Sequence, residues 1–178
     1  MQRRAFTPRP HWRSQCEQLG FTFHSIDGTY WDESAAYEFT LEQIETLESA
    51  SEDLHQRCLE AVDWIVRHEH FAPFALPPRA RELIVDSWQR QEPSLYGRFD
   101  FSWDGTGAPK LLEYNADTPT GLLEASVVQW FWLQDVLPDA DQFNSLHEQL
   151  IERWRALDPG GPVHFAALAG HEEDTGNA

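Results

Sequence analysis

The stretch from residue 96 to residue 133 constrains the fold most, because two alternating segments there flank a glycine-rich turn. In the segment 98–103 aromatic residues alternate with polar ones, and the segment 110–115 shows a similar alternation. Successive side chains on a strand point to opposite faces, so both segments are predicted to be strands with one apolar face. The turn 104–109, with the sequence DGTGAP, fits the loop of a β-hairpin. We therefore predict that this hairpin organises the chain.

One face of the predicted hairpin carries four polar side chains, which are Arg98, Asp100, Glu113 and Asn115. The carboxylate and amide oxygens among them are hard ligands, of the kind that Mg²⁺ takes together with phosphate oxygens and water. Arg98 offers a planar donor fork that fits a phosphate or a carboxylate. The set indicates a metal–nucleotide site. A solvated strand face with a surface ion pair would show the same alternation, so both interpretations stay open on the pattern alone.

The rest of the chain is predicted to be mainly helical in 1–92, with further helices and a buried strand in 93–178. Apolar spacing, capping signals and helix-stopping residues predict helices over 10–19, 40–68, 78–91, 121–134 and 143–157. The helix 121–134 is apolar nearly all round and is expected to be buried. The apolar run 163–169 follows a Gly/Pro break and is predicted to be a strand of the same sheet as the hairpin.

These elements predict an α/β fold, with α+β as the alternative, in which helices pack on a mixed sheet around a central antiparallel hairpin. A chain of 178 residues suits one domain with a substantial core. The acidic run 170–175 follows the last predicted strand. Ligands in open α/β sheets bind beyond the carboxyl ends of the strands, so this run is placed like a ligand-binding loop.

The composition argues against several classes of function. The net charge is −17, from 13 basic and 30 acidic residues, which repels nucleic acid and anionic membranes and favours cationic partners such as a polyamine. Cys16 and Cys58 form no CxxC pair or Cys/His cluster, so zinc is not expected. The N-terminus lacks the apolar region of a signal peptide, and no stretch approaches the roughly 18 apolar residues of a membrane helix. We expect a cytoplasmic protein with reduced thiols.

Two runs within the central stretch resemble the signature of the glutathionylspermidine synthase family. They are Arg98-Phe99-Asp100 and the segment 112–120, with the sequence LEYNADTPT. The helix that begins with the residues LLEA at 122–125 also fits that family. The resemblance is strongest over 94–134 and extends more weakly to both ends. It implies the preATP-grasp-like, N-terminal part of an ATP-grasp-type ligase.

The resemblance also implies a reaction and a metal site. Such ligases convert a carboxylate into an acyl phosphate and then join it to an amine. In glutathionylspermidine synthase the carboxylate belongs to glutathione and the amine to spermidine. By motif position, Asp100, Glu113 and Asn115 match the Mg²⁺ ligands of the family. Arg98 matches the catalytic arginine that steadies the transferring phosphate.

Further positions match substrate contacts of the family. Thr118 and Thr120 fall where hydroxyl residues hold the peptide substrate, and Glu172 or Glu173 falls near an acidic position that receives the amine. The family's chains are roughly twice as long as this one, and their later part carries the lysines that clamp ATP. Lys110 is the single lysine of this sequence, so the ATP site is expected to lie mostly outside it.

Two functions follow from these observations. The chain is the substrate- and Mg²⁺-binding part of an ATP-dependent carboxylate–amine ligase, either as a fragment or as a natural truncation. Alternatively, it is a non-catalytic acidic module, for example for polyamines, that has lost the ATP-binding half. The oligomeric state has no signal in the sequence.

Overall fold

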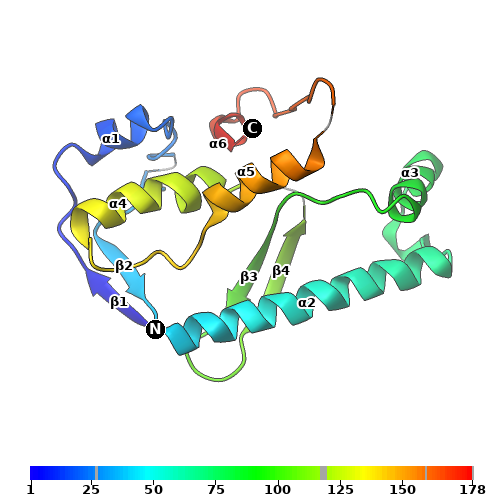
Figure 1. Ribbon diagram of the computed structural model, residues 1–178, viewed down its shortest axis with the longest axis horizontal. Helices are drawn as coiled ribbons and strands as arrows, with labels where there is room; N and C mark the ends of the chain where they lie inside the picture. The colour runs from blue at the N-terminus through cyan, green and yellow to red at the C-terminus, as the bar shows by residue number, and fades with distance from the viewer. Residues whose placement is uncertain (27, 117–119, 159, 178) are drawn as a thin grey trace. The chain divides into compact units, whose positions relative to one another are not determined.

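The computed structural model of the protein describes residues 1–26, 28–116, 120–158 and 160–177. Figure 1 labels its helices and strands. The chain divides into two compact units. The first unit contains Met1–Thr40, Leu95–Arg98 and Tyr114–Ala178, and the second contains Leu41–Ser94 and Phe99–Glu113.

The first unit begins with a two-stranded antiparallel sheet that the sequence did not predict. Strand β1 (Gln2–Ala5) pairs with β2 (Ala35–Glu38), so that Gln2 lies opposite Glu38. The four residues of β1 read QRRA, and all four are exposed, so no apolar alternation marks them as a strand. Helix α1 (Trp12–Gln18) lies between the two strands in sequence and confirms the helix predicted over 10–19.

The core of the first unit joins α1 to the helix that follows the hairpin. Its fully buried members are Cys16, Phe21, Phe23 and Val128. The rings of Phe21 and Phe23 meet edge to face with their centroids 4.6 Å apart, which is a favourable geometry for two aromatic rings. Residues near the N-terminus and residues after 120 therefore share one core.

The helix predicted over 121–134 is present as a π-helical turn, η2 (Glu124–Val128), followed without a break by α4 (Gln129–Val136). Trp132 and Leu133 are buried, whereas Trp130 and Phe131 are exposed by 40% and 47%. The expectation that this helix is buried all round was therefore wrong, because in the first unit it is covered on one side. Helix α5 (Leu146–Leu157) confirms the prediction over 143–157.

The strand predicted over 163–169 is absent from the described structure. Residues 162–168 have no regular secondary structure and are exposed, and Phe165 rests against the ring of Trp154. A strand needs a partner for its backbone groups, and the described strands pair with one another in two separate two-stranded sheets rather than one mixed sheet. A short helix, α6 (Glu172–Asn177), replaces the predicted acidic loop.

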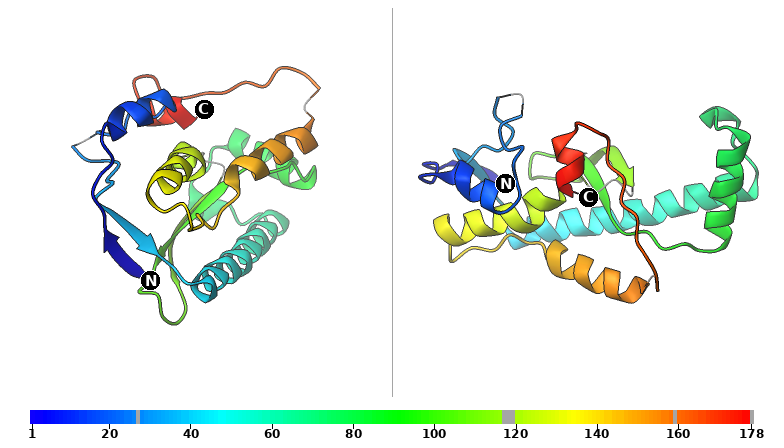
Figure 2. Two further views of the ribbon diagram at one scale, coloured as in Figure 1. Left: turned by 60° about the vertical axis from the view of Figure 1, so that its left-hand side comes forward. Right: turned by 90° about the horizontal axis from the view of Figure 1, so that it is seen from above.

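The second unit contains the long helix α2 (Leu41–Arg67), the 3₁₀ turn η1 (Ala72–Phe74) and helix α3 (Pro78–Gln89), as Figure 2 shows. Pro78 occupies the first turn of α3, as predicted. The indole Nε1 of Trp88 on α3 donates a 3.1 Å hydrogen bond to Asp63 on α2. No helix in the described ranges is both long and apolar enough to cross a membrane.

The predicted hairpin is present. Strand β3 (Gly97–Ser102) pairs with β4 (Lys110–Ala116), and the glycine-rich turn connects them. Within the second unit, the Gln43 amide on α2 donates a 2.9 Å hydrogen bond to the Gly105 carbonyl in that turn. The fold is thus of the predicted α/β class, with helices and antiparallel sheets that include the hairpin.

Candidate functional site

Strands β3 and β4 place Arg98 and Asn115 on one face of the hairpin. A Cβ atom built on Gly97 would lie only 2.8 Å from Cε2 of Tyr114, so the tyrosine ring covers Gly97. Gly97 and Tyr114 therefore share a face. Arg98 and Asn115 follow them by one residue, so their side chains leave the opposite face.

Arg98 is held at the beginning of the helix that follows the hairpin. Its Nη1 donates a 2.8 Å hydrogen bond to Thr120 Oγ1. A Cβ built on Gly121 would lie 3.9 Å from the same nitrogen. Gly121 has φ +77°, a conformation that glycine adopts without strain. The structure thus brings two of the predicted residues, Arg98 and Thr120, into direct contact.

Asn115 has hydrogen-bonding capacity that the described protein does not use. Its side chain is partly buried, and its Nδ2 atom is inaccessible and has no hydrogen-bond partner among the described residues. A buried donor without a partner costs about 1–3 kcal/mol. A ligand oxygen beside Asn115 would remove that cost, and it would lie on the hairpin face that carries Arg98.

Asp100 and Glu113 belong to the second unit, so the four predicted side chains do not all lie in one unit. Asp100 is partly buried and Glu113 is exposed. Among the residues that the structure describes, no three His, Cys, Asp or Glu side chains form a group that could hold a metal ion. The predicted set has two carboxylates and one amide, and these three hard oxygens fit Mg²⁺ by their chemistry. Their convergence on one ion stays a prediction.

The remaining predicted residues lie elsewhere. Thr118 is outside the described residues. Glu172 and Glu173 belong to α6 and not to a loop after a strand, so that part of the prediction was wrong. Glu172 is exposed, whereas Glu173 is partly buried. A Cβ on Gly176 would lie 2.5 Å from Cε1 of Phe23, so the glycine lets α6 approach the core closely.

Two residues that the sequence did not single out meet beside α6. The Tyr30 hydroxyl donates a 2.8 Å hydrogen bond to Glu124 Oε1. Glu124 is 8% exposed, and its Oε2 is buried without a hydrogen-bond partner in the described part of the chain. Burial, the hydrogen bond to Glu124 and the nearby charge of Glu173 raise the pKa of Tyr30 well above its ordinary value. The sequence did carry a signal, because Glu124 is the single charged residue between Asp117 and Asp135.

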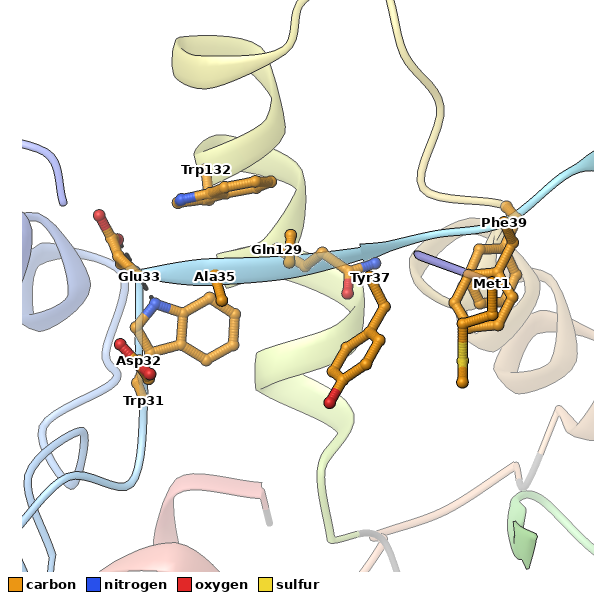
Figure 3. Close-up of a pocket in the computed structure, with 11 residues that line it drawn as sticks. Met1, Trp31, Asp32, Glu33, Ala35, Tyr37, Phe39, Gln129 and Trp132 are labelled. Carbon is orange, nitrogen blue, oxygen red and sulfur yellow. Dashed lines mark hydrogen bonds between the residues drawn. The ribbon is translucent and has the colours of Figure 1, made fainter. Parts of the chain in front are cut away.

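The first unit also has a pocket of about 520 Å³, which Figure 3 shows between β2 and α4. Trp132 and Gln129 come from α4, and Ala35 and Tyr37 come from β2. Its aromatic lining consists of Trp31, Tyr37, Phe39, Trp132 and Phe143. The residues named above for the site are not part of this lining, so the pocket and the site are separate places in the first unit.

The sequence profile of the family described as glutathionylspermidine synthase preATP-grasp matches residues 3–178, which is nearly the whole chain. The chain belongs to this family. Two proteins of Crithidia fasciculata are similar to it. A trypanothione synthetase is 27% identical over 86% of the chain, and a glutathionylspermidine synthase is 41% identical over 34% of it. A Haemophilus influenzae protein assigned as an acid–amine ligase is 41% identical over 97% of the chain.

This member of the glutathionylspermidine synthase family spans less than half the length of the curated relatives that it matches. The aligned part is 46% of the Haemophilus protein, 22% of the trypanothione synthetase and 8% of the Crithidia glutathionylspermidine synthase. The preATP-grasp match covers both Arg98 at the hairpin and Glu124 on the following helix.

Proposed function

We propose that this chain is the substrate- and Mg²⁺-binding part of an ATP-dependent carboxylate–amine ligase. The substrates would be a peptide carboxylate such as that of glutathione and an amine such as spermidine. Family membership and the names of the relatives support this assignment. The observation that carries it is the 2.8 Å contact between Arg98 and Thr120, on the hairpin face where Nδ2 of Asn115 is buried without a hydrogen-bond partner among the described residues.

These residues would act on anionic oxygens. The Arg98 guanidinium is a planar, positively charged donor group and would neutralise a phosphate or carboxylate oxygen. The Thr120 hydroxyl accepts from Arg98 and can still donate its own proton to a peptide substrate. The first amides of the helix after Gly121 carry partial positive charge and would add to this attraction. Electrostatic stabilisation of this kind usually dominates phosphoryl transfer.

The oxygens of Asp100, Glu113 and Asn115 would hold Mg²⁺. When bound, the ion would offset the negative charge of phosphate oxygens. The overall reaction would join the carboxylate to the free amine at the expense of ATP, with release of ADP and of phosphate, which takes up the proton that the amine loses. The acidic residue Glu173 is the candidate that receives the amine.

The metal assignment is tested by Glu113→Gln in a complete enzyme that carries these residues. The change keeps the shape of the side chain but removes its charge. Turnover should fall by about two orders of magnitude or more, because a charged group of the reaction centre is lost. The urea midpoint should stay the same or rise slightly. Turnover is measured against Mg²⁺ concentration, since a weakened site needs more ion.

The control for this experiment is Glu52→Gln, which removes an exposed carboxylate from α2. It should leave turnover and its Mg²⁺ dependence unchanged. Wild-type kinetics for Glu113→Gln would contradict the site assignment, and with it most of the proposed function.

The isolated chain should not join glutathione to spermidine when ATP is added. Lys110 is its single lysine, so the lysines that clamp ATP in the family have no counterpart in this sequence. The measurement is phosphate release with and without both substrates. Robust release that depends on both would show that the chain is a complete catalyst, contrary to the proposal.

A further inference from the structure

The pocket of the first unit lies apart from the site described above and has no part in the proposed function. It has a volume of about 520 Å³, and Figure 3 shows the residues that line it. We call it the aromatic pocket, because its lining includes Trp31, Tyr37, Phe39, Trp132 and Phe143. Sites for small organic molecules have volumes of about 300–1,000 Å³ and are lined mainly by apolar and aromatic side chains. The aromatic pocket has both properties.

Two walls of the aromatic pocket are held in place by contacts with residues outside its lining. The Trp132 ring meets the Phe6 ring edge to face, with the centroids 5.3 Å apart and the planes at 89°. The Trp31 ring meets Phe21 of the core in the same way, at 5.8 Å and 86°. These rings are therefore positioned before any ligand binds. A site that is already ordered loses little conformational entropy on binding, which favours affinity.

The pocket is hollow because small residues occupy the beginning of β2. Ala35 and Ala36 belong to the lining, and each contributes a single methyl group. Large aromatic side chains stand beside them in water, since Tyr37 is 58% exposed and Phe143 is 54% exposed. The Phe143 ring packs edge to face on Phe39, with the centroids 5.7 Å apart. A ligand in the hollow would cover this exposed aromatic surface, and the hydrophobic effect would favour its binding.

The two carboxylates of the lining are engaged by groups of the protein. Glu33 pairs with Arg9 at 2.6 Å. Asp32 accepts hydrogen bonds from the backbone amide and the hydroxyl of Ser34, at 2.8 and 2.9 Å, and these bonds lower the pKa of its carboxyl. Asp32 is therefore ionised at neutral pH and repels an anion, as does the net charge of −17. Because both carboxylates already have partners, a neutral ligand fits the lining better than a cation.

The polar groups of the lining are mainly hydrogen-bond acceptors for a ligand. The Trp31 indole donates its N–H to Glu33 at 3.4 Å, so this donor is used within the protein. The Gln129 amide nitrogen donates to Gln142 Oε1 at 3.4 Å, and the oxygen of the same amide can accept from a ligand. The oxygen of the Tyr37 hydroxyl can also accept. A ligand that carries an N–H or O–H donor would match these groups.

We propose that the aromatic pocket binds a small, neutral, planar aromatic molecule that carries an N–H or O–H donor, such as a phenol or an indole. The ring of the ligand packs against the aromatic side chains of the lining, and its donor meets the amide oxygen of Gln129. Offset and edge-to-face contacts between rings favour an aromatic ligand over an aliphatic one of equal size. This site is independent of the ligase assignment, because the two places share no residue.

Binding to the 178-residue chain is measured with N-phenyl-1-naphthylamine, a neutral aromatic amine with one N–H that fluoresces more strongly in apolar surroundings. Its fluorescence should rise to saturation with one site per chain. The dye 8-anilino-1-naphthalenesulfonate has the same rings and an added sulfonate. It should bind at least about tenfold more weakly, because Asp32 and the net negative charge repel it. Benzyl alcohol should displace the neutral dye at lower concentrations than benzyltrimethylammonium, which is a cation, or toluene, which has no donor.

Two variants change the pocket, and each has a matched control. Ala35→Leu fills the hollow and should weaken binding of the neutral dye about tenfold or more. Tyr37→Ser removes one ring and should weaken it about two- to tenfold. The controls are Ala5→Leu, at the residue opposite Ala35 in the sheet, and Phe165→Ser, at an exposed aromatic residue of the first unit. Neither residue lines the pocket, so both controls should bind the dye as the wild type does.

Circular dichroism and thermal melting check that the four variants fold. If Ala35→Leu does not fold, Tyr37→Ser decides the question, because that side chain is exposed and its loss leaves the core intact. Absence of saturable binding by the wild type, or unchanged binding by the folded Tyr37→Ser variant, would contradict the site. Tighter binding of the sulfonate dye, or displacement by benzyltrimethylammonium at lower concentrations than benzyl alcohol, would contradict the choice of a neutral ligand.

Discussion

Two buried carboxylates of the first unit are satisfied to very different degrees. Glu33 is 2% exposed and accepts hydrogen bonds from the Arg9 side chain, from the Arg9 backbone amide and, at 3.4 Å, from the Trp31 indole. Glu124 is 8% exposed and accepts one from Tyr30. Both lie close to the same aromatic core, so burial alone does not separate them.

The two carboxylates differ in the hydrogen-bond donors that surround them. Arg9 contacts both oxygens of Glu33, and its Nη1 reaches Asp135 at 2.7 Å, so its charge is shared within the protein. A buried charge that is paired and fully hydrogen-bonded costs little, whereas one that lacks donors is expensive. Glu33 is therefore satisfied within the first unit, and its fold depends on keeping both members of the pair together. Glu124 has one buried oxygen, Oε2, without a hydrogen-bond partner among the described residues, so its charge is less completely satisfied than that of Glu33.

The largest expected effect comes from removing Arg9, the cation that pairs with Glu33. Arg9→Met leaves Glu33 buried without its cation and should lower the free energy of unfolding by about 3–5 kcal/mol. Urea denaturation measures the change. The double variant Arg9→Met/Glu33→Leu removes both charges and should recover most of the loss.

The control for Arg9 is Arg4, which lies on the nearby strand β1. Arg4 pairs with Glu38, but both side chains are substantially exposed. Because water screens such a pair, Arg4→Met should cost less than about 1 kcal/mol. An Arg9→Met loss as small as that of Arg4→Met would show that Glu33 does not depend on Arg9.

The Arg9 pair also shows where prediction from sequence ends. Arg9 and Glu33 are 24 residues apart, and Arg9 and Asp135 are 126 apart. No local pattern connects such positions, since strand and helix periodicities describe neighbours along the chain. The same limit hid β1 and β2, because their pairing is non-local and β1 carries no apolar alternation.

Local sequence patterns predicted the elements that depend on residues close together along the chain. The hairpin 97–116 and helices α2 and α3 follow from alternation, capping and proline placement, and the structure confirms all three. The run 163–169 has the apolar composition of a strand, but it pairs with no strand among the described residues. The prediction from composition alone was therefore wrong. The contact between Arg98 and Thr120 follows from the hairpin and the loop after it, whereas the position of Glu173 depends on how α6 packs on Phe23.

A smaller effect, of the opposite sign, is expected at Glu124. Glu124→Gln keeps an acceptor for the Tyr30 hydroxyl and removes a buried charge that lacks a full set of donors. Unfolding free energy should be unchanged or rise by about 1 kcal/mol, measured by urea denaturation at pH 7. A loss of unfolding free energy as large as that of Arg9→Met would show that the fold depends on the charge of Glu124 as it does on the Arg9–Glu33 pair. The contrast between the two carboxylates would then disappear.

Tyr30 provides a spectroscopic readout of the same carboxylate. Its pKa is raised above the ordinary value, first by burial and then by the hydrogen bond to Glu124. Tyr30 should therefore ionise at a higher pH than an ordinary tyrosine, which ionises near about pH 10, when absorbance near 295 nm is followed. In Glu124→Gln this late tyrosine should ionise earlier, while Tyr37→Phe should leave the late transition in place. A late transition unmoved by Glu124→Gln would contradict the assignment of the bond.

The smallest expected effect concerns Cys16. The charge of Glu33 contributes to the pKa of its thiol, just as Glu124 contributes to the pKa of Tyr30. Burial, and next the charge of Glu33, raise the pKa of the Cys16 thiol from 9.0 to about 11, against a lowering by Arg9. The folded protein thus holds the thiol proton more tightly than the unfolded chain. Its contribution to stability is complete below pH 9 and is lost as pH rises from 9 to about 11.

Urea midpoints across this range should fall more steeply for the wild type than for Cys16→Ala. Cys58→Ala, at the other cysteine of the sequence, is measured beside it as the control for the loss of a thiol. Equal slopes for the wild type and Cys16→Ala would mean that water reaches the region around Glu33. The Glu33 carboxylate would then be less completely enclosed than its contrast with Glu124 requires.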